Sequence, residues 1–510
     1  MLGIDVVIPD VTYLVKNKDK IRGLVLTHGH EDHIGAIPYV IKDLGCPIYA
    51  TRMTAGLVGL KLQEHGLADE VKVINVNAGD KLKLGCFKVE LIHINHSIAD
   101  SVSLAITTPV GILIHTGDYK IDTTPVDGEM IDLVRFGELG NKGVLALLPD
   151  STNVERPGYS VSESRVGPAI ESYFRDCNKR IILTTFASNV HRIQQIINCA
   201  AKFGRKVGIT GRSMENVMKV ATELGYLNIP EGVVVDMTKI KNYPRDKVAI
   251  ITTGSQGEEM SALYRMAFSG HKQVEIDSED RVIISASAIP GNEKTIDKVV
   301  NELSYKGAEV IYDRNAGLHA SGHACQEELK MMLALTKPKF VIPLHGEHRH
   351  LRAHAKLAQE MGIDPKNIAI SEIGKVIELT GKSLKFNGTV PSGKVLVDGT
   401  GVGDVGSVVL RDRKHLAQDG MLVVVVGVSS EDGSVVSGPD IITRGFIYVK
   451  ESEELIGTLK NLTNEAIAEC TSRKVSDWST MKGSVKSKLS DYLYKTTKRN
   501  PMILPVIMEI

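Results

Sequence analysis

A cluster of metal-binding residue types between Thr27 and Gly35 constrains this chain more than any other stretch. It reads Thr-His-Gly-His-Glu-Asp-His-Ile-Gly and holds three imidazoles and a carboxylate, those of His28, His30, Asp32 and His33. Such side chains are costly to bury unless something pairs with them. A metal ion supplies that pairing, and histidine nitrogen with carboxylate oxygen suits zinc, manganese or iron. The sequence therefore predicts a metal site here rather than a polar surface loop.

The spacing His-x-His-x-Asp-His resembles the signature of the metallo-β-lactamase superfamily. An apolar run over 23–26 precedes the cluster, and apolar residues at helical spacing over 34–44 follow it. The cluster is therefore predicted to lie on a strand-to-helix loop. The resemblance implies that one metal ion is ligated by His28 and His30, and a second by Asp32 and His33. Each ion then needs further ligands from later in the chain.

Three later residues are candidates for these further ligands, because each directly follows a predicted strand. They are His96, Asp118 and His345. α/β proteins concentrate their chemistry at such strand ends. With the cluster they complete two sites bridged by Asp118, one formed by His28, His30 and His96 and the other by Asp32, His33 and His345. A dinuclear site polarises a phosphoryl oxygen and lowers the pKa of a bridging water.

Length and composition limit the classes of protein to which this chain can belong. At 510 residues the chain is expected to form about two to four domains. Lys+Arg and Asp+Glu are both 61, so the net charge does not indicate a partner, and a polyanion would need a local basic patch. The six cysteines are scattered without a Cys-x-x-Cys pair. This argues against a disulfide framework or a thiolate zinc site and is typical of a protein of the reducing cytoplasm. The longest apolar run, 421–428, is too short to span a membrane. We expect a soluble cytoplasmic protein without a membrane partner.

The pattern of predicted strands and helices indicates several domains. Within 1–160, short strands alternate with helices, as in a sheet sandwich flanked by helices. Within 161–317 the alternation becomes regular, which predicts a parallel sheet in a second α/β domain. The stretch 318–380 returns to a strand and a His-rich loop, so the second domain is predicted to be inserted into the first. A Gly-rich linker is predicted over 381–406 and a small α+β domain over 407–510.

Asp150, His323 and His345 extend the resemblance. Asp150 opens an Asp-Ser-Thr-Asn stretch, His323 precedes a predicted helix, and His345 follows the return from the insertion. In this order they resemble motifs A, B and C of the β-CASP nucleases, and nearly the whole chain resembles bacterial ribonuclease J. The resemblance implies a metallo-β-lactamase αββα sandwich, an inserted parallel α/β (β-CASP) domain and a small C-terminal α+β domain. The superfamily usually opens with strands that carry an Asp supporting the metal ligands. We expect the first few of these strands to be missing here, or the chain to be a fragment.

The resemblance implies a metal-dependent ribonuclease that degrades 5′-monophosphorylated RNA in the 5′→3′ direction and also cuts internally. Its roles would be RNA maturation, including rRNA processing, and mRNA decay. His323, oriented by Asp150, is a reasonable proton donor because histidine titrates near neutral pH. A turn or helix cap is an equal alternative for Asp150, because Asp-Ser-Thr-Asn is rich in capping side chains.

Two loops of small residues are candidate phosphate sites. Each precedes a predicted helix, whose free backbone N–H groups favour an anion, although most such loops are ordinary turns. The resemblance implies a pocket for a 5′-monophosphate end, formed by Ser188, Asn189, Val190, His319, Ala320, Ser321, Gly322 and His323. A pocket at a fixed short distance from the metal ions would measure off one nucleotide per cut.

The expected cofactors are two divalent ions per subunit, zinc or manganese, because His/Asp sites accept both. The resemblance also suggests a structural calcium ion near the linker, with Asp398 as a ligand. It implies RNA as substrate, a homodimer or homotetramer supported by the C-terminal domain, and other RNA-decay proteins as partners. RNA rests on the resemblance alone, since aromatic content is 5% and no aromatic run offers a stacking platform.

Two other functions stay open from the sequence. The first is a metallo-hydrolase of a small thioester or lactam, which the long insertion with Asp150 and His323 speaks against, because a small substrate does not require such a lid. The second is a truncated, inactive subunit that only binds RNA or a partner. The complete ligand set argues against that alternative, because a chain that had lost its activity should also have lost a ligand.

Overall fold

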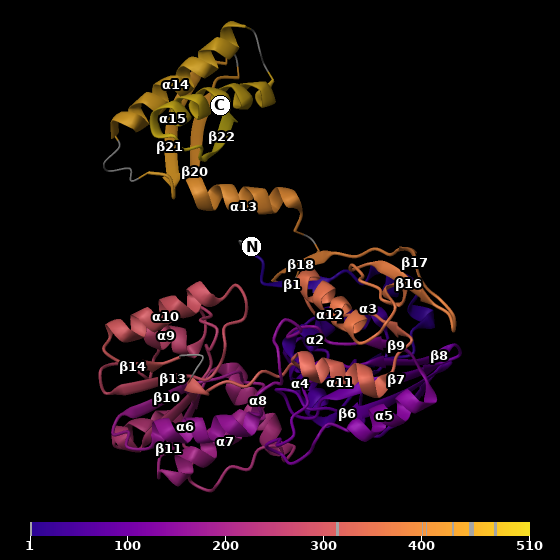
Figure 1. Ribbon diagram of the computed structural model, residues 1–510. Helices are drawn as coiled ribbons and strands as arrows, with labels where there is room; N and C mark the ends of the chain where they lie inside the picture. Colours follow the sequence, from indigo (N-terminus) through magenta and orange to yellow (C-terminus); the bar gives the residue numbers. More distant parts are fainter. Residues whose placement is uncertain are drawn as a thin grey trace. The chain divides into compact units, whose positions relative to one another are not determined.

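A computed structural model gives the fold of this chain, which divides into two compact units (Figure 1). One unit comprises Pro9–Gly393, and the other combines the residues up to Ile8 with Lys394–Ile510. The structure describes residues 3–312, 316–399, 401–403, 405–430, 433–447, 453–473 and 477–510.

Two sheets packed face to face form what we call the sandwich part of the larger unit. The larger sheet has the order β15-β9-β8-β7-β6-β5, with β5 (Lys81–Leu84), β6 (Phe87–His93), β7 (Val102–Thr108), β8 (Gly111–His115), β9 (Val144–Leu148) and β15 (Phe340–Val341). The smaller, parallel sheet contains β2 (Leu24–Val25), β3 (Ile48–Ala50) and β4 (Val73–Asn75). Val89 and Leu91 of β6 belong to the core shared with the smaller sheet, whereas Ile92 belongs to the core on the opposite face. This alternation is the period of a β-strand.

Helices cover both outer faces of the sandwich. The larger sheet shares a hydrophobic cluster with α5 (Leu133–Lys142), α11 (Gln326–Thr336) and α12 (His348–Glu360). The smaller sheet packs against α3 (Ile37–Leu44) and α4 (Arg52–Glu64). The short helices α1 (Thr12–Lys16) and α2 (Glu31–Ile34) complete this part. The helix–sheet–sheet–helix order confirms the predicted αββα sandwich.

The inserted part is built on a five-stranded parallel sheet of order β11-β12-β10-β13-β14. Its strands are β10 (Arg180–Thr184), β11 (Lys206–Thr210), β12 (Val248–Thr252), β13 (Asp280–Ile284) and β14 (Glu309–Ile311). One face packs against α6 (Val166–Phe174), α7 (Val190–Lys202) and α8 (Arg212–Glu223), and the other against α9 (Ala262–Ala267) and α10 (Glu293–Tyr305). Apolar strands buried on both faces are typical of such sheets, so the predicted inserted α/β domain is confirmed.

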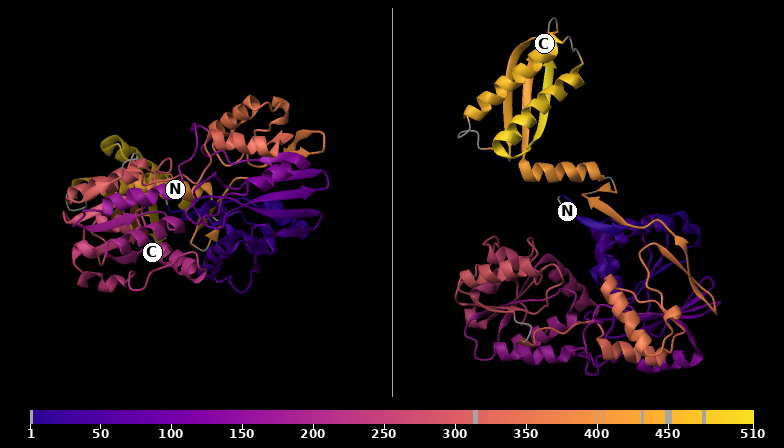
Figure 2. Two further views of the ribbon diagram at one scale, coloured as in Figure 1. Left: turned by 60° about the horizontal axis from the view of Figure 1, so that its bottom comes forward. Right: turned by 45° about the horizontal axis from the view of Figure 1, so that its top comes forward.

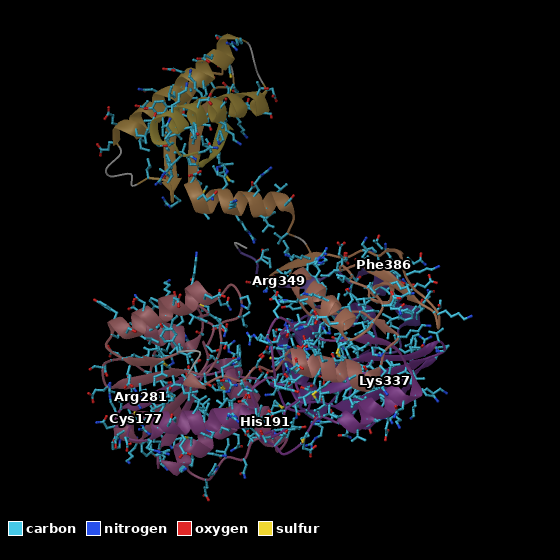
Figure 3. All side chains as sticks on the ribbon, viewed as in Figure 1. Cys177, His191, Arg281, Lys337, Arg349 and Phe386 are labelled. Carbon is cyan, nitrogen blue, oxygen red and sulfur yellow. The ribbon has the colours of Figure 1, made fainter. Side chains whose placement is uncertain are left out.

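The sandwich and inserted parts are packed against each other. One hydrophobic cluster includes residues of α4 and of α8, and Tyr226 donates a hydrogen bond of 2.7 Å to Asp100. His191 at the start of α7, labelled in Figure 3, lies 3.6 Å from Asp127 of the sandwich part. These contacts fix the position of the loops of one part relative to the loops of the other.

The smaller unit contains two sheets. The first has the order β1-β18-β19, with β1 (Val6–Pro9), β18 (Lys394–Asp398) and β19 (Gly401–Val402). After α13 (Ser407–Asp419), a second sheet of order β21-β20-β22 is formed by β20 (Met421–Val428), β21 (Val435–Arg444) and β22 (Met502–Glu509). Helices α14 (Glu453–Ser472) and α15 (Trp478–Thr497) share a core with this sheet (Figure 2, right). The pattern agrees with the predicted α+β domain.

Two segments differ from their predicted roles. Residues 3–8 were expected in the sandwich, but Asp5 donates a backbone hydrogen bond to Val397, which places them with the C-terminal unit. The predicted linker, 381–406, contains β17 (Leu384–Thr389), which pairs with β16 (Lys375–Leu379), and also β18 and β19. A composition rich in Gly, Ser and Thr does not prevent strand pairing where a partner strand is available. Within the described residues, no helix is both long and apolar enough to cross a membrane.

Candidate metal centre and substrate cleft

The His-rich loop leaves β2 and turns directly into α2. His28 lies in the loop with no exposed surface, His30 caps α2, and Asp32 and His33 lie on the helix. The Thr27 hydroxyl lies 3.1 Å from His28 Nδ1. The other ring nitrogen of His28, Nε2, is buried without a hydrogen-bond partner in the described part of the chain. Such an unsatisfied nitrogen is costly unless it binds something.

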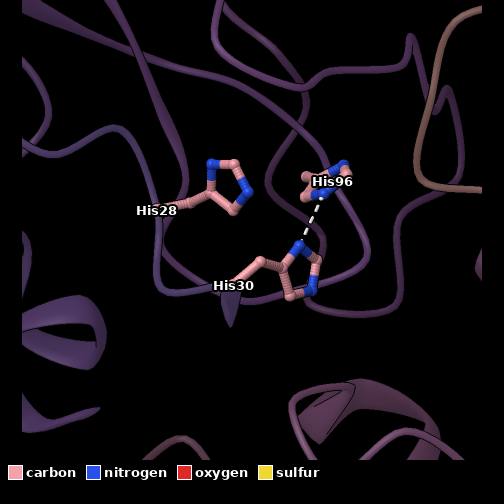
Figure 4. A group of neighbouring side chains, drawn as sticks. All are labelled: His28, His30 and His96. Carbon is pink, nitrogen blue, oxygen red and sulfur yellow. Dashed lines mark hydrogen bonds between the residues drawn. The ribbon is translucent and has the colours of Figure 1, made fainter. Parts of the chain in front are cut away.

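His28, His30 and His96 form a first group of potential metal ligands (Figure 4), in which the ligand atoms lie within 4.8 Å of one another. His96 donates from Nδ1 to the Gly322 carbonyl (2.7 Å), and its Nε2 lies 3.0 Å from His30 Nδ1. Burial lowers the pKa of His30 to about 4 and the pKa values of His28 and His96 below their ordinary value. The three imidazoles are therefore neutral at pH 7, the form that binds metal.

Asp32, His33, Asp118 and His345 form a second group. His345 Nε2 lies 3.2 Å from Asp32 Oδ2. Burial opposes the charged form of His345, but hydrogen bonds to Asp150 and Asp32 outweigh it and raise its pKa to about 11. The carboxylates thus create a negative potential that favours a cation, and a divalent ion satisfies it as a proton does. The donor set fits two divalent metal ions.

Asp118 lies within reach of both groups. Its buried Oδ2 atom is 3.2 Å from His33 Nε2, 3.5 Å from His345 Nε2 and 3.7 Å from His28 Nε2. One carboxylate oxygen of Asp118 thus faces ligands of both groups, as a residue that bridges two metal ions must. The structure thus brings together all seven predicted ligands, and their individual roles stay predictions.

The buried Asp150 and the partly exposed His323 form a pair beside these groups. His323 donates from Nδ1 to Asp150 Oδ2 at 2.7 Å. Burial opposes both charges, but their mutual attraction lowers the pKa of Asp150 and raises the pKa of His323. Asp150 Oδ1 also accepts hydrogen bonds from the Thr152 backbone N–H (2.9 Å) and hydroxyl (2.7 Å). The two alternatives for Asp150 therefore coexist, since it caps a turn with one oxygen and holds His323 with the other.

A cleft of about 450 Å³ connects the metal-ligand groups with the candidate phosphate loops. His30, Asp32 and Asp118 line it together with His323 on the sandwich side. The phosphate-loop residues that line it are Ser188, Asn189, His319, Ala320 and Ser321, and its apolar lining includes Phe186, Ile289 and Pro290. Loops that are 131 residues apart in sequence, counted from Ser188 to His319, thus face one cleft.

Four family models match this chain. The metallo-β-lactamase superfamily matches residues 6–128, and the Zn-dependent metallo-hydrolase RNA specificity domain matches 307–368. The β-CASP domain of ribonuclease J matches 178–303, and the ribonuclease J C-terminal domain matches 408–510. The models therefore cover both compact units.

Curated relatives match over the full length. Ribonuclease J2 of Bacillus subtilis (strain 168) is 43% identical over 510 residues, which cover 100% of this chain and 92% of that protein. Ribonuclease J 1 of Streptococcus pyogenes is 42% identical over 100% of this chain and 90% of its own length. Ribonuclease J 2 of Staphylococcus aureus (strain NCTC 8325 / PS 47) is 40% identical over 100% and 91%. The chain belongs to the ribonuclease J family.

In this ribonuclease J family member, Arg192 is a buried residue of the site that the sequence did not indicate. Its guanidinium makes two hydrogen bonds to Glu163, of 2.8 and 2.7 Å. It also donates to the carbonyls of Ser285 (2.7 Å) and Ala320 (3.4 Å). Arg192 thus ties the second candidate phosphate loop to α7. No local sequence signal could find this residue, because its partners are distant in sequence.

Thr152 is a second residue of the site that the sequence did not indicate, although it lies in the Asp-Ser-Thr-Asn stretch that begins at Asp150. Its hydroxyl lies 2.9 Å from His345 Nδ1 and donates to Asp150. It therefore connects the Asp150–His323 pair to a predicted metal ligand of this ribonuclease J family member. The sequence contained a signal for this residue, because a Thr two residues after an Asp commonly forms hydrogen bonds within such a turn.

Three predicted residues take positions other than those expected for this ribonuclease J family member. The Val190 side chain is buried in the core, and its N–H donates to Ser188 (2.9 Å). Gly322 contributes its carbonyl to His96 rather than a surface of the cleft. Asp398, the predicted calcium ligand, pairs with the guanidinium of Arg413. The calcium site stays a prediction, because residues 400 and 404 of this segment lie outside the described part of the chain.

Proposed function

We propose that this member of the ribonuclease J family, a metal-dependent ribonuclease, removes nucleotides one at a time from 5′-monophosphorylated RNA and also cuts RNA internally. The observation that carries this proposal is the single cleft that joins the metal-ligand groups to two loops of small polar residues. A substrate that spans both ends would present a phosphodiester at one end and a terminal phosphate at the other.

The two ligand groups would hold two divalent ions, zinc or manganese, with His28, His30 and His96 around one and Asp32, His33 and His345 around the other. When bound, such ions polarise the scissile phosphoryl group and lower the pKa of the attacking water. Asp118 faces both groups and would bridge them. Neutral imidazoles and carboxylates suit both metals, so the metal content of the purified protein decides between them.

The proton for the leaving 3′-oxygen would come from His323. The Asp150 carboxylate accepts the Nδ1 proton of His323, which fixes the ring and favours its protonated form. Hydrolysis then releases a 5′-mononucleotide with a free 3′-hydroxyl and leaves a new 5′-monophosphate on the RNA. The product of one cut is therefore a substrate for the next.

The terminal phosphate would be bound by the two loops at the other end of the cleft. The hydroxyls of Ser188 and Ser321 line this end, and the Asn189 side chain caps the first turn of α7 by accepting from Arg192 N–H (3.0 Å). Hydroxyl and backbone N–H donors at a helix start favour an anion. We place this activity in the cytoplasm, where the six free cysteines would stay reduced.

The deciding experiment is degradation of one internally labelled RNA that carries a 5′-monophosphate, a 5′-triphosphate or a 5′-hydroxyl, with added Zn²⁺ or Mn²⁺. We expect release of mononucleotides, fastest from the monophosphate. Asp118→Ala should abolish cleavage, and the exposed Asp69→Ala should not. Internal cuts alone would remove the 5′-end pocket from the proposal, and no cleavage by a protein that retains metal would favour a small substrate or an inactive subunit.

A further inference from the structure

A second cavity of about 410 Å³ adjoins the substrate cleft, and we call it the side chamber. It is lined by Arg156, Tyr159, Ser160, Val161, His319 and Cys325, among others. Arg156 and His319 also line the substrate cleft, as does Ser321, so the two cavities meet beside the second phosphate loop. Three of the predicted metal ligands, His30, Asp32 and Asp118, line the cleft, and none of the seven lines the side chamber. The chamber therefore lies beyond the phosphate end of the cleft.

The side chamber also reaches the surface. Tyr159 is 63% exposed and Val161 is 53% exposed, and both line the chamber. The chamber is thus a second connection between the phosphate end of the cleft and solvent. Its volume falls within the range of roughly 300–1,000 Å³ that is typical of small-molecule sites.

Polar groups in the chamber are free to bind a ligand. Within the described residues, the Arg156 side chain makes no hydrogen bond or ion pair, whereas its backbone is held by Asn153 (2.9 Å) and Gln326 (3.0 Å). His319 Nδ1 is buried without a hydrogen-bond partner in the same described part. Burial and the charges of Arg192 and Arg156 lower the pKa of His319 to about 3, so this ring is neutral and the Arg156 guanidinium lies near it. A guanidinium on a fixed backbone suits a phosphate.

We propose that the side chamber is a second nucleotide site, which receives the 5′-mononucleotide released at each cut before it leaves the protein. Arg156 binds the phosphate of the product, and the exposed ring of Tyr159 stacks on its base, an interaction that every base allows. The need for such a site follows from the proposed function, on which this inference rests. The remaining RNA would still occupy the metal end of the cleft and block that route to solvent. A mononucleotide bound at the phosphate loops would therefore leave more readily through the side chamber.

The first test is equilibrium dialysis of 5′-AMP against the full chain, which requires no catalysis. We expect two molecules of AMP per chain, one at the phosphate loops and one in the side chamber. The double variant Arg156→Gln/Tyr159→Ala should weaken the side-chamber site by about fivefold or more. Because Arg156 also lines the cleft, Tyr159→Ala alone, at a residue that lines only the side chamber, should likewise weaken one site and keep the other. The matched control, Arg175→Gln/Tyr305→Ala, changes residues that line neither cavity and should keep both sites. Fewer than two AMP per chain, or two that the first double variant leaves in place, would overturn the proposal.

The second test asks whether the product uses this route. Val161→Trp narrows the chamber at its exposed rim, and Val134→Trp places the same residue on the exposed side of α5, where Val134 is 74% exposed. We expect Val161→Trp to slow steady-state release of mononucleotides about threefold or more relative to the first cut. Equal rates of mononucleotide release in the two variants would count against the chamber as the exit route. So would a Val161→Trp variant in which the first cut is slowed as much as steady-state release. A protein that releases no mononucleotides would refute the proposed function, while AMP binding would still decide the site.

Discussion

At the scale of single residues, His354 of α12 shows how a buried imidazole couples stability to pH. Its Nδ1 lies 2.9 Å from the Ser151 hydroxyl, and its Nε2 is buried without a hydrogen-bond partner in the described residues. Burial lowers the pKa of His354 to about 4. The unfolded chain, with a pKa near 6.5, therefore takes up the proton first as the pH falls, and stability is lost between about pH 6.5 and pH 4.

We predict that this residue alone lowers the free energy of unfolding by about 2 kcal/mol between pH 7 and pH 5. His354→Gln, which can still pair with Ser151 but does not titrate, should flatten that pH dependence. Thermal unfolding at both pH values measures it, with the exposed His65→Gln as control. The same pH dependence in the wild type and His354→Gln would contradict the prediction.

A second residue-scale prediction separates the proton donor from the metal ligands. Asp150 and His323 also belong to a third group of potential ligands, with Asp118 and His345. Asp150→Asn removes the charge that favours protonated His323, so kcat on monophosphorylated RNA should fall about 10²–10⁴-fold. Metal content, measured by mass spectrometry of the purified protein, should not change. A loss of metal would instead make Asp150 a ligand.

At the scale of elements, the loop between His319 and His323 depends on one close approach. A Cβ added at Gly322 would lie 2.6 Å from His96 Nδ1 and 2.6 Å from Ser97 Oγ. Real Cβ atoms essentially never come so close, so in Gly322→Ala either the loop or the His96 and Ser97 side chains must shift, which disturbs the hydrogen bond between His96 and the Gly322 carbonyl. The carbonyl fixes the ring orientation of a predicted metal ligand, and such partners typically matter 10–100-fold for metal affinity.

We therefore predict that Gly322→Ala lowers metal affinity at least about tenfold and also weakens the preference for a 5′-monophosphate. Metal retention after dialysis against a chelator measures the first effect, and competing RNAs measure the second. Gly59→Ala is the matched control, because a Cβ there meets nothing within 4 Å in helix α4. If Gly322→Ala retained metal and preference like Gly59→Ala, the loop would not hold His96 in place.

At the scale of the whole molecule, the C-terminal unit has an apolar sheet face that the helices leave open. In β22, Ile503 belongs to the core. The apolar residues on the other face of the strand are exposed: Leu504 by 51%, Val506 by 36% and Met508 by 47%. Exposed apolar patches of this kind mark protein–protein contacts. We therefore propose that the C-terminal domain supports the homodimer or homotetramer that the family resemblance implies.

We predict that Leu504→Asp/Met508→Asp lowers the oligomer mass in light scattering and weakens RNA degradation, without unfolding the unit. Deletion of residues 408–510 should have the same effect on mass, because it removes the whole sheet. Tyr494→Asp on α15, where Tyr494 is 58% exposed, should leave the mass unchanged. An unchanged mass for the sheet variant would place the interface elsewhere.

The sequence by itself determined the sandwich with its insertion and the set of candidate metal ligands. His28, His30, Asp32 and His33 lie in one loop, so their proximity follows from local spacing. His96, Asp118 and His345 follow strands, and strand ends of one sheet meet at a common edge. The alternation of predicted strands and helices indicated the sandwich and the inserted parallel sheet, because the spacing of apolar residues is a local property of the chain.

Only the tertiary structure decided which distant segments complete the site. Arg192 holds Glu163 and Ala320, and the N-terminal residues pair with β18 rather than with the sandwich. The side chamber likewise arises from segments around Tyr159 and His319 that no spacing connects. Hydrogen bonds between distant segments and the shape of cavities depend on how whole elements pack. Local propensity and periodicity carry no information about that packing.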